Sequence, residues 1–269
     1  MSSPNNIRFV PKAILLDMDG VLYHGDEVIL DAIAFMQSIS EIPHCFITNN
    51  PILLSSQITL KLDKMGFGKI SIKSIVTSGE ACALWLSKQK KSFHYYAVGA
   101  QGLHDALAKY GIADEINADY VVVGEGQGID YESLTKGINL IKGKQAKLIS
   151  TNPDQTVDSS VNGKHVILPG GGALVSPFVI ATGQEPVTIG KPYPLLYETA
   201  LARLNVQADD CLMIGDRPDT DIKGAAQLGM KTALVRTGRF KDNDKWPNDC
   251  PKPTWDVANL EQLKRLLFN

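Results

Sequence analysis

Apolar runs that end in polar residues recur along the chain, and they predict buried strands. The clearest run, residues 13–16, shows no polar alternation, as expected of a central parallel strand that is covered on both faces. It leads straight into Asp17 and Asp19, and Gly20 then breaks the run. In an open parallel sheet the ligand crevice lies beyond the carboxyl ends of the strands. We therefore expect a site here, with a turn at Met18 that leaves one carboxylate ahead of the strand and the other to its side.

Similar apolar runs alternate with helix-like segments over the rest of the chain. Pro51 suits the first turn of a helix that Gly66 stops, and Asn259 with Gln262 resembles a capping box before a C-terminal helix. The predicted strands are residues 44–47, 74–77, 95–98, 120–123, 147–150, 211–214 and 232–235, and the predicted helices are residues 29–39, 52–65, 102–110, 131–141, 194–204 and 218–228. This alternation with short connections is typical of an α/β protein with a doubly wound parallel sheet.

The 269 residues allow one large domain or two modest ones. The polar groups that accompany the first strand resume only at Gly190, after a long middle section with its own alternation of strands and helices. We therefore interpret residues 1–78 and 184–269 as a Rossmann-like core and residues 79–183 as an inserted α/β cap domain. Residues 241–253, rich in Asp, Asn, Lys and Pro, are expected to form a surface loop.

Composition and charge narrow the class of protein. A hydrophobic content of 44% and a charged content of 21% are those of a soluble globular chain. With a formal net charge of −2 and no long Lys/Arg run, we expect neither nucleic acid nor membrane as a partner. The start has no signal-peptide core and no segment has the apolar length of a spanning helix, so we expect a cytoplasmic protein. The oligomeric state stays open, a homo-oligomer included.

Cysteine usage fits this location. The four cysteines form no CxxC pair, and Cys45 and Cys211 lie in apolar, strand-like runs. Free and mostly buried thiols are the simplest interpretation.

Four groups of polar residues follow apolar strands or precede a helix, and together they favour phosphate chemistry. Acidic residues without a partnering His or Cys suit a hard cation such as Mg²⁺. A hydroxyl, an amide and a lysine suit the oxygens of a phosphoryl group, whose transfer is catalysed mainly by positioning and charge neutralisation. The groups are Asp17 with Asp19, Thr48 with Asn49, Lys191, and Asp216 with Asp221.

Each group also has a simpler structural interpretation. Asp-x-Asp-Gly at residues 17–20 is ordinary turn chemistry, and the same holds for residues 216–221. Taken alone, Thr48 would be a helix cap, and Lys191 a solvated surface lysine. The occurrence of all four groups in one chain lowers the weight of these alternatives.

Four motifs occur in this order: DMDGV (residues 17–21), ITNN (47–50), GKP (190–192) and GDRPDTD (215–221). They resemble those of the haloacid dehalogenase (HAD) superfamily of aspartate-nucleophile phosphotransferases. The resemblance covers nearly the whole chain. It implies that Asp17 is a nucleophile that becomes an aspartyl phosphate. It also implies that Asp19 is the acid/base, which protonates the leaving oxygen and then activates water.

The remaining roles follow from the same resemblance and from charge. A carboxylate that attacks an anionic phosphate faces repulsion, which a divalent cation relieves. Asp216 would hold that ion together with Asp17 and Asp19, and Asp221 would be a ligand or would accept from metal-bound water. Lys191 would supply a point charge to the phosphate. Thr48 and the amides near Asn49 would bind the other phosphate oxygens.

The spacing of the motifs points to one branch of the superfamily. The 31 positions from residue 17 to residue 48 leave room for one helix, whereas the 143 from residue 48 to residue 191 can hold a cap domain. With the TNN and GKP forms, this resembles the NagD-like or para-nitrophenylphosphatase-like branch. By that resemblance Asn152 and Asp154 approach the site. The Gln-Thr-Val that follows Asp154 departs from the more aromatic, proline-containing stretch of many relatives.

The leading hypothesis is a Mg²⁺-dependent phosphatase that hydrolyses a small phosphomonoester, such as a sugar phosphate, nucleoside monophosphate, glycerol phosphate or phosphoglycolate, through an aspartyl phosphate. A phosphotransferase or mutase would use the same nucleophile and is the alternative. A dehalogenase would leave the acids other than Asp17 without an evident purpose. A non-enzymatic binding protein would be favoured only if an essential acid were missing, and none is.

Overall fold

A computed structural model of the chain describes residues 9–161 and 164–268. Residues 1–8, which contribute to the expectation that the chain has no signal peptide, lie outside this part. Across the described residues, each helix is too short or too polar to span a membrane. By their internal contacts the residues form two compact units. The first unit comprises Met1–Phe46, Met65–Phe67 and Leu201–Asn269, and the second comprises Ile47–Lys64 and Gly68–Ala200.

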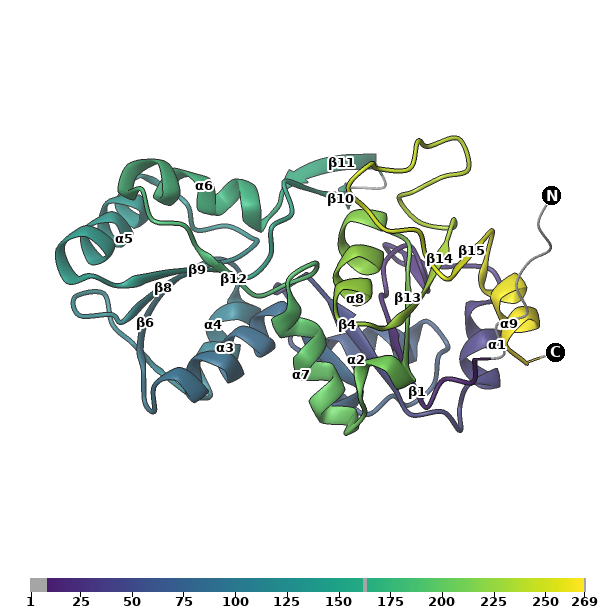
Figure 1. The fold of residues 1–269 in the computed structure, drawn as a ribbon. Coiled ribbons are helices and arrows are strands. Elements are labelled where there is room, and N and C mark those ends of the chain that lie inside the picture. Colours follow the sequence, from purple (N-terminus) through teal and green to yellow (C-terminus); the bar gives the residue numbers. More distant parts are fainter. Residues whose placement is uncertain (1–8, 162–163, 269) are drawn as a thin grey trace. The chain divides into compact units, whose positions relative to one another are not determined.

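A six-stranded sheet contains the first apolar run at its centre (Figure 1). Its order is β15-β14-β13-β1-β4-β5, and the strands from β15 to β4 pair in parallel. The chain builds this sheet in both directions from β1, which is the topological switch point of a doubly wound fold. The strands are β1 (Ala13–Leu16), β4 (His44–Thr48), β5 (Ile75–Thr77), β13 (Cys211–Gly215), β14 (Lys231–Val235) and β15 (Trp255–Val257). The predicted α/β fold class is therefore confirmed.

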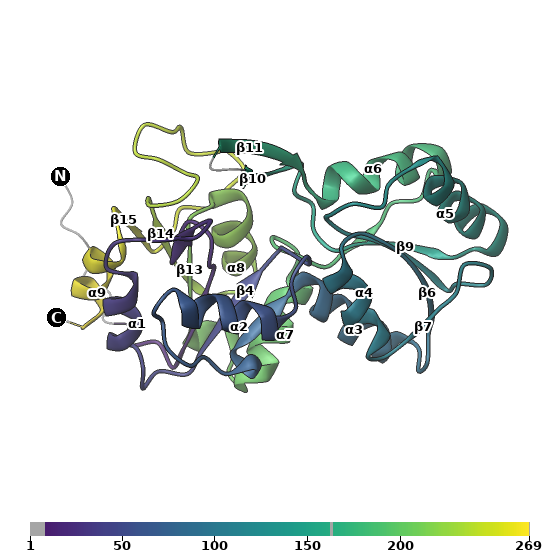
Figure 2. The same ribbon diagram turned by 180° about the vertical axis from the view of Figure 1, so that it is seen from behind.

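Two helices of the first unit, α1 (Ala32–Ser38) and α9 (Leu260–Phe268), lie side by side (Figures 1 and 2). The N-terminus of α9 is capped as predicted, because Asn259 Oδ1 accepts from the Gln262 amide at 2.9 Å. The helix α1 is shorter than the predicted 29–39, since Asp31 has a φ of +69° and stands outside the helical region. A short hairpin of β2 (Tyr23–His24) and β3 (Glu27–Val28) precedes it.

The start of the helix predicted over residues 52–65 is wrong by one turn. The helix, α2 (Ser55–Lys64), begins at Ser55. Asn50 Oδ1 accepts from the Ile52 amide at 2.8 Å, and this local turn competes with helix at Pro51. Gln57 Oε1 then accepts from the Leu54 amide at 2.9 Å, just ahead of the first helical residue.

A five-stranded parallel sheet forms the centre of the second unit, in the order β12-β9-β8-β6-β7. Helices α3 and α4 cover one face and α5 and α6 the other (Figures 1 and 2). The strands are β6 (His94–Val98), β7 (Ile112–Ala113), β8 (Tyr120–Val123), β9 (Lys147–Ser150) and β12 (Val187–Thr188). The helices are α3 (Ser78–Gln89), α4 (Gln101–Ala108), α5 (Tyr131–Lys144) and α6 (Gly171–Thr182).

Several elements of the second unit were absent from the sequence prediction, among them the two-residue strands β7 and β12. Another is α3, whose start Thr77 caps by accepting from the Glu80 amide at 3.1 Å. An antiparallel pair of strands, β10 (Thr156–Val161) and β11 (Lys164–Pro169), was also not predicted. By contrast, the predicted helix over 194–204 matches α7 (Pro194–Leu204). The predicted division into core and cap, with boundaries after residues 78 and 183, stays a proposal.

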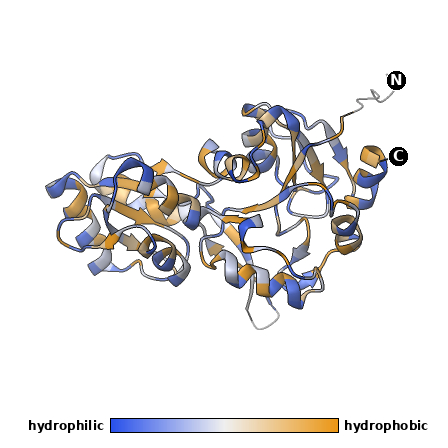
Figure 3. Ribbon diagram, turned by 90° about the horizontal axis from the view of Figure 1, so that it is seen from below, coloured by the Kyte–Doolittle hydropathy of each residue, from blue (hydrophilic) through white to orange (hydrophobic). Residues whose placement is uncertain are grey.

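Hydrophobic residues gather on the strands, whereas the helices carry hydrophobic and hydrophilic residues alike (Figure 3). In the second unit, Val121 and Val123 of β8 pack with Phe178 of α6. The four cysteines are free and buried, as predicted. Burial raises the pKa of the Cys45 and Cys211 thiols to about 12, so both are neutral thiols at ordinary pH.

Candidate active site

Three predicted acids of the first unit lie together: Asp17, Asp216 and Asp221, which we call the acidic cluster. Each offers a carboxylate oxygen, and these oxygens lie within 4.8 Å of one another. The register of the sheet produces the cluster, because Leu16 of β1 stands beside Ile214 of β13 and both strands run in the same direction. Asp216 and Asp221 are buried, and Asp17 is half-buried.

A turn after β1 separates the two acids of the first motif, as predicted. The amides of Val21 and Leu22 donate to the carbonyl of Met18 at 3.2 and 2.8 Å. Asp17 therefore joins the acidic cluster, whereas the Asp19 side chain is 68% exposed and has His24 Nδ1 at 4.0 Å from its carboxylate. Asp19 is not among the three clustered acids, so its role as a metal ligand stays a prediction.

Backbone groups fix the two buried acids of the cluster. Asp221 Oδ2 accepts from the amides of Asp216 and Arg217 at 3.2 and 3.1 Å. Asp221 reaches back to these amides from a π-helical turn, Pro218–Ile222, which leads into the short helix α8 (Lys223–Gln227). The predicted single helix over residues 218–228 is therefore wrong in its first turn.

Glycines make room for Asp216. A Cβ at Gly20, whose φ is +81°, would stand 2.6 Å from Asp216 Oδ2, and a Cβ at Gly238 would stand even closer to the same oxygen. Arg239 donates its amide to that oxygen. The Gly20 loop is held in turn by Thr237, whose Oγ1 donates to the Gly20 carbonyl at 2.7 Å. The carboxylate of Asp216 is thus fixed by close backbone contact on two sides.

The potential at the acidic cluster is negative, and a nearby phenol responds to it. The buried Tyr23 has a pKa well above its ordinary value, first because burial disfavours the phenolate and then because the carboxylates of Asp19 and Asp17 repel it. A cation at this edge of the sheet would meet an attractive field.

In the second unit, several predicted site residues form hydrogen bonds with Asn49, which directly follows β4. Asn49 Oδ1 accepts from the Lys191 amide at 2.7 Å, and its Nδ2 donates to the Lys191 carbonyl at 3.0 Å and to Asp154 Oδ2 at 2.8 Å. Gly190 permits this approach, since a Cβ there would stand 2.6 Å from Asn49 Oδ1. The Lys191–Pro192 peptide bond is cis.

Asn152 extends this set of contacts. Its Nδ2 donates to the Asn49 carbonyl at 2.8 Å and to Glu125 Oε1 at 2.7 Å. Its Oδ1 accepts from the amides of Asp154 and Gly171 at 3.0 and 3.2 Å. We call Asn49, Glu125, Asn152, Asp154 and Lys191 the Asn49 network.

Lys191 and Thr48 are the two predicted phosphate-binding residues whose surroundings decide between the functional and the structural interpretation. Lys191 is only 2% exposed, which excludes the interpretation as a solvated surface lysine. Thr48, half-buried at the end of β4, accepts from the Asn50 amide at 3.2 Å, so it also makes the local turn contact that its structural alternative requires. The predicted site residues therefore form two groups, one in each unit. Asp17, Asp216 and Asp221 lie in the first, and Asn49, Asn152, Asp154 and Lys191 are linked in the second.

Several known proteins are similar to this chain in sequence and in fold. The model of a family described as haloacid dehalogenase-like hydrolase matches residues 14–113, and a second, HAD-hydrolase-like, matches residues 188–263. An acid sugar phosphatase of Staphylococcus haemolyticus is 35% identical over 88% of this chain and 91% of its own length. The 5'-nucleotidase YutF of Bacillus subtilis is 34% identical (93% and 96%), and a dihydroxyacetone phosphatase of Corynebacterium glutamicum is 39% identical (93% and 89%).

The chain belongs to the haloacid dehalogenase-like hydrolases. Among solved structures, NagD from E. coli matches with a TM-score of 0.82 at 27% identity, covering 94% of this chain and 98% of NagD. A 4-nitrophenylphosphatase from Thermotoga maritima matches with a TM-score of 0.87 at 29% identity (96% and 97%). The predicted family, its NagD-like branch and the enzyme class of phosphomonoesterase are thereby confirmed.

The acidic cluster of this hydrolase fits a divalent metal ion. The donor set consists of carboxylates alone, which suits a hard, oxygen-preferring cation better than zinc or copper. Three carboxylates at this spacing repel one another, and a divalent cation offsets that repulsion.

Sequence reasoning missed one member of the Asn49 network, Glu125. It is 2% exposed and lies two residues past the end of β8. The signal was present in the sequence: Glu125 follows the apolar run 120–123 much as Asp17 follows 13–16. The pattern of a polar residue after a buried strand therefore extends to both sheets.

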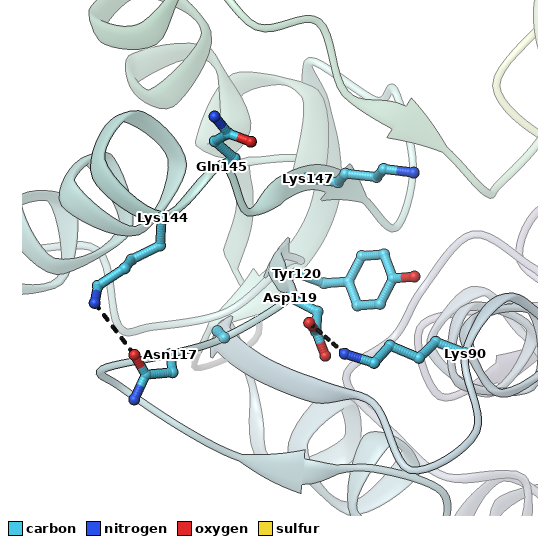
Figure 4. A pocket seen from close by; sticks show the side chains of 8 residues that line it. Lys90, Asn117, Asp119, Tyr120, Lys144, Gln145 and Lys147 are labelled. Atoms are coloured by element: carbon cyan, nitrogen blue, oxygen red, sulfur yellow. Dashed lines mark hydrogen bonds and ion pairs between the residues drawn. The ribbon is translucent and has the colours of Figure 1, made fainter.

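A cavity of about 340 Å³ at the opposite, amino-terminal edge of the five-stranded sheet contains none of the predicted site residues (Figure 4). Three lysines line it, but two already have partners: Lys90 donates to Asp119 at 2.7 Å and Lys144 to Asn117 at 3.2 Å. Lys90 and Lys144 also stand at the C-terminal ends of α3 and α5, where cations offset the partial negative charge of the last carbonyls. These lysines therefore have a structural purpose in the hydrolase.

Proposed function

We propose that this hydrolase is a Mg²⁺-dependent phosphatase that cleaves a small phosphomonoester through an aspartyl phosphate. The observation that carries the proposal is the acidic cluster, which stands past the carboxyl ends of β1 and β13 with Asp17 as the first residue of the HAD motif. The relatives named above are phosphatases and a nucleotidase, which supports hydrolysis of phosphate esters.

In this proposal the carboxylate of Asp17 attacks the phosphorus atom, and the bond between phosphorus and the leaving oxygen breaks. Asp19 donates a proton to that oxygen, so the alcohol leaves neutral. In the second half, Asp19 takes a proton from water, which attacks the phosphorus of the aspartyl phosphate and frees Asp17. The side chain of Asp19 is 68% exposed, so water has access to it, which supports a role in proton transfer.

The metal would be held by the carboxylates of Asp17, Asp216 and Asp221, with Asp19 as a further predicted ligand. When bound, Mg²⁺ neutralises negative charge on the phosphate and on the nucleophile. The protein's part is to keep these carboxylates converging, which the amides of Asp216 and Arg217 and the glycine contacts do.

The substrate's phosphoryl group would be bound by Lys191, by Thr48 and by backbone amides near Asn49. Asn49 supports this role by holding both the amide and the carbonyl of Lys191. Asn152 and Asp154 would line the substrate side of the same site, which the cap domain over residues 79–183 would cover.

The substrate would be a small phosphorylated metabolite in the cytoplasm, with neither nucleic acid nor a membrane as a partner. The named relatives act on sugar phosphates, 5'-nucleotides or dihydroxyacetone phosphate, so the shared feature is a phosphate monoester on a small polar alcohol. With water as acceptor, the enzyme is a phosphatase; a phosphotransferase would give the group to an alcohol instead.

An initial-rate screen of phosphate monoesters with Mg²⁺ tests the proposal. We expect hydrolysis of several small esters, with selectivity expressed as ratios of kcat/KM. We also expect Asp17→Asn to abolish turnover while the circular dichroism spectrum stays that of the parent. Turnover that persists in the pure variant, or a parent enzyme inactive on every ester, would contradict it. Transfer to added alcohols at the expense of water would favour the phosphotransferase.

A further inference from the structure

Glu125 is a buried acid that the proposed chemistry does not use. Its side chain lies in the second unit at the carboxyl end of β8, and the residue is 2% exposed. Burying a carboxylate is costly unless hydrogen bonds compensate it. Its backbone carbonyl accepts from the Ala100 amide at 2.8 Å, but any residue would offer that carbonyl. The carboxylate therefore needs a separate explanation.

One partner of the carboxylate is Asn152, at 2.7 Å from Nδ2 to Oε1. An amide side chain has two N–H donors and an oxygen that can accept twice. Asn152 uses all four: Nδ2 donates to Glu125 and to the Asn49 carbonyl, and Oδ1 accepts from the amides of Asp154 and Gly171. A reversed amide would direct its oxygen at the Glu125 carboxylate and at the Asn49 carbonyl. Glu125 thus helps to impose one orientation on Asn152.

The consequence extends along the Asn49 network. The Asn49 carbonyl accepts from Asn152, and the Asn49 side chain holds the peptide groups on both sides of the Lys191 Cα at 2.7 and 3.0 Å. A fixed Asn152 therefore restrains the backbone that follows β4 and, through Asn49, the backbone of Lys191. Ser78 Oγ also donates to the Asn49 carbonyl, so that carbonyl keeps one donor when Asn152 is disturbed.

We infer that Glu125 is a positioning residue of the hydrolase: as a hydrogen-bond acceptor it orients Asn152, and through Asn49 it fixes the backbone of Lys191. Glu125 itself touches neither substrate nor metal in this account. The inference rests on the proposed function, because it assigns Lys191 to the phosphoryl group.

Variants at Glu125 distinguish three properties of the side chain: its hydrogen-bond acceptor, its charge and its volume. Glu125→Gln keeps an oxygen acceptor without the charge, and Glu125→Met keeps a similar volume without an oxygen. We expect Glu125→Met to lower kcat/KM by about 10- to 100-fold, as loss of an outer-shell partner does at comparable sites. We expect Glu125→Gln to rescue most of that loss. If the two variants are equally impaired, or if Glu125→Met is as active as the parent, the inference is wrong.

Another glutamate of the same unit supplies the matched control. Glu80 accepts from Ser55 Oγ at 2.8 Å and has a side chain that is 13% exposed; its hydrogen bond is to Ser55 and its ion pair to Lys109, away from Asn152 and Asn49. We expect Glu80→Met to lower the melting temperature and to leave kcat/KM of the folded enzyme unchanged. An equal loss of kcat/KM in Glu80→Met and Glu125→Met would mean that burial alone explains the effect.

Two further measurements keep the inference testable if Glu125→Met does not fold. Glu125→Asp keeps the charge but withdraws the acceptor by one methylene, so it should be more impaired than Glu125→Gln. In addition, Asn152→Ala can be combined with either Glu125→Gln or Glu125→Asp. The kcat/KM of each double variant should be no lower than that of Asn152→Ala alone, because Glu125 acts through Asn152. Additive losses would overturn the inference.

A readout without catalysis distinguishes failure of this inference from failure of the proposed function. Nuclear magnetic resonance can follow the hydrogen exchange of the Asn152 and Asn49 side-chain amides. We expect faster exchange in Glu125→Asp or Glu125→Met and parent-like exchange in Glu125→Gln. Unchanged exchange in all variants contradicts the inference. A parent protein that is inactive on phosphate esters but shows the expected exchange pattern would contradict the proposed function alone.

Discussion

The acidic cluster and the Asn49 network differ in the interactions between their side chains: repulsion in the cluster and hydrogen bonding in the network. The cluster in the first unit gathers Asp17, Asp216 and Asp221, and each ionised pair repels by roughly 3.5 kcal/mol or more at an effective dielectric of about 20. In the network of the second unit, the side-chain amides of Asn49 and Asn152 donate to carboxylates and backbone carbonyls and accept from backbone amides. A cation would therefore stabilise the cluster, whereas hydrogen bonds within the protein hold the network.

This difference indicates how the enzyme divides its work. In the acidic cluster, backbone amides and closely approaching glycines hold carboxylates of like charge near one another. In the Asn49 network, hydrogen bonds between buried polar groups favour one conformation of the backbone that we propose to bind the phosphate. A mutation that removes an acceptor or a charge should therefore act differently in the two regions.

The largest effect is expected in the acidic cluster. Asp216→Asn should lower kcat/KM by more than about 100-fold at fixed Mg²⁺, above what loss of an outer-shell partner costs. The same change should leave the metal-free protein as stable as the parent or more so, because it removes one repelling charge while the amide oxygen can still accept from Arg239. Steady-state kinetics and metal-free thermal unfolding check the two halves.

The matched control is Asp219→Asn, two residues from Asp221. Its side chain is 56% exposed and pairs with Arg217 at 2.8 Å, outside the cluster. We expect little change in kcat/KM. A clear loss of metal-free stability in Asp216→Asn, or parent-like activity, would mean that the cluster is an ordinary structural ion-pair site.

A smaller effect, of opposite sign on stability, is expected in the network. Asn49→Asp removes the donor to Asp154 Oδ2 and to the Lys191 carbonyl and places two carboxylates in contact. We expect the free energy of unfolding to fall by about 1–3 kcal/mol, the cost of an unsatisfied buried group. Chemical denaturation measures it.

Asn50→Asp is the control for this change, because it adds the same charge one residue away. Asn50 is exposed, and its Oδ1 accepts from the Ile52 amide, which an aspartate can also do. We expect a stability close to the parent's. Equal losses in Asn49→Asp and Asn50→Asp would show that added charge, and not the network, sets the effect.

The sequence predicted all three acids of the cluster because local rules bring them together. An unbroken apolar run followed by Asp17 implies a strand end, and parallel pairing brings strand ends to one edge of the sheet. Asp216 and Asp221 follow another apolar run in the same way, and the resemblance to the HAD motifs gives them their expected role. Local rules did not predict the π-helical turn at Pro218–Ile222. In this turn the Asp221 carboxylate accepts a hydrogen bond from the Asp216 amide, a contact that the predicted regular helix does not include.

The Asn49 network was harder to predict because its contacts join distant segments. The sequence assigned Lys191 and the amides near Asn49 to the phosphate and placed Asn152 near the site, but it did not predict contacts among these residues. The contacts show that Asn49 also serves the Lys191 backbone, over a separation of 142 residues. Glycine provides the physical reason for the GKP motif here: only a residue without a Cβ lets Asn49 approach Gly190. Glu125 was missed because it lies between Gly124 and Gly126, and an acid in a glycine-rich segment is typical of a surface loop, although the apolar run before it carried the signal of a strand end.

Acid-quench mass spectrometry of the enzyme with a phosphomonoester and Mg²⁺ tests the central claim most directly. The account predicts a transient population in which one phosphoryl group is bound to the peptide that contains Asp17, and it predicts that Asp17→Asn never shows this population. A phosphoryl group on another residue, or full turnover by Asp17→Asn with no bound phosphoryl group at any time, would contradict it.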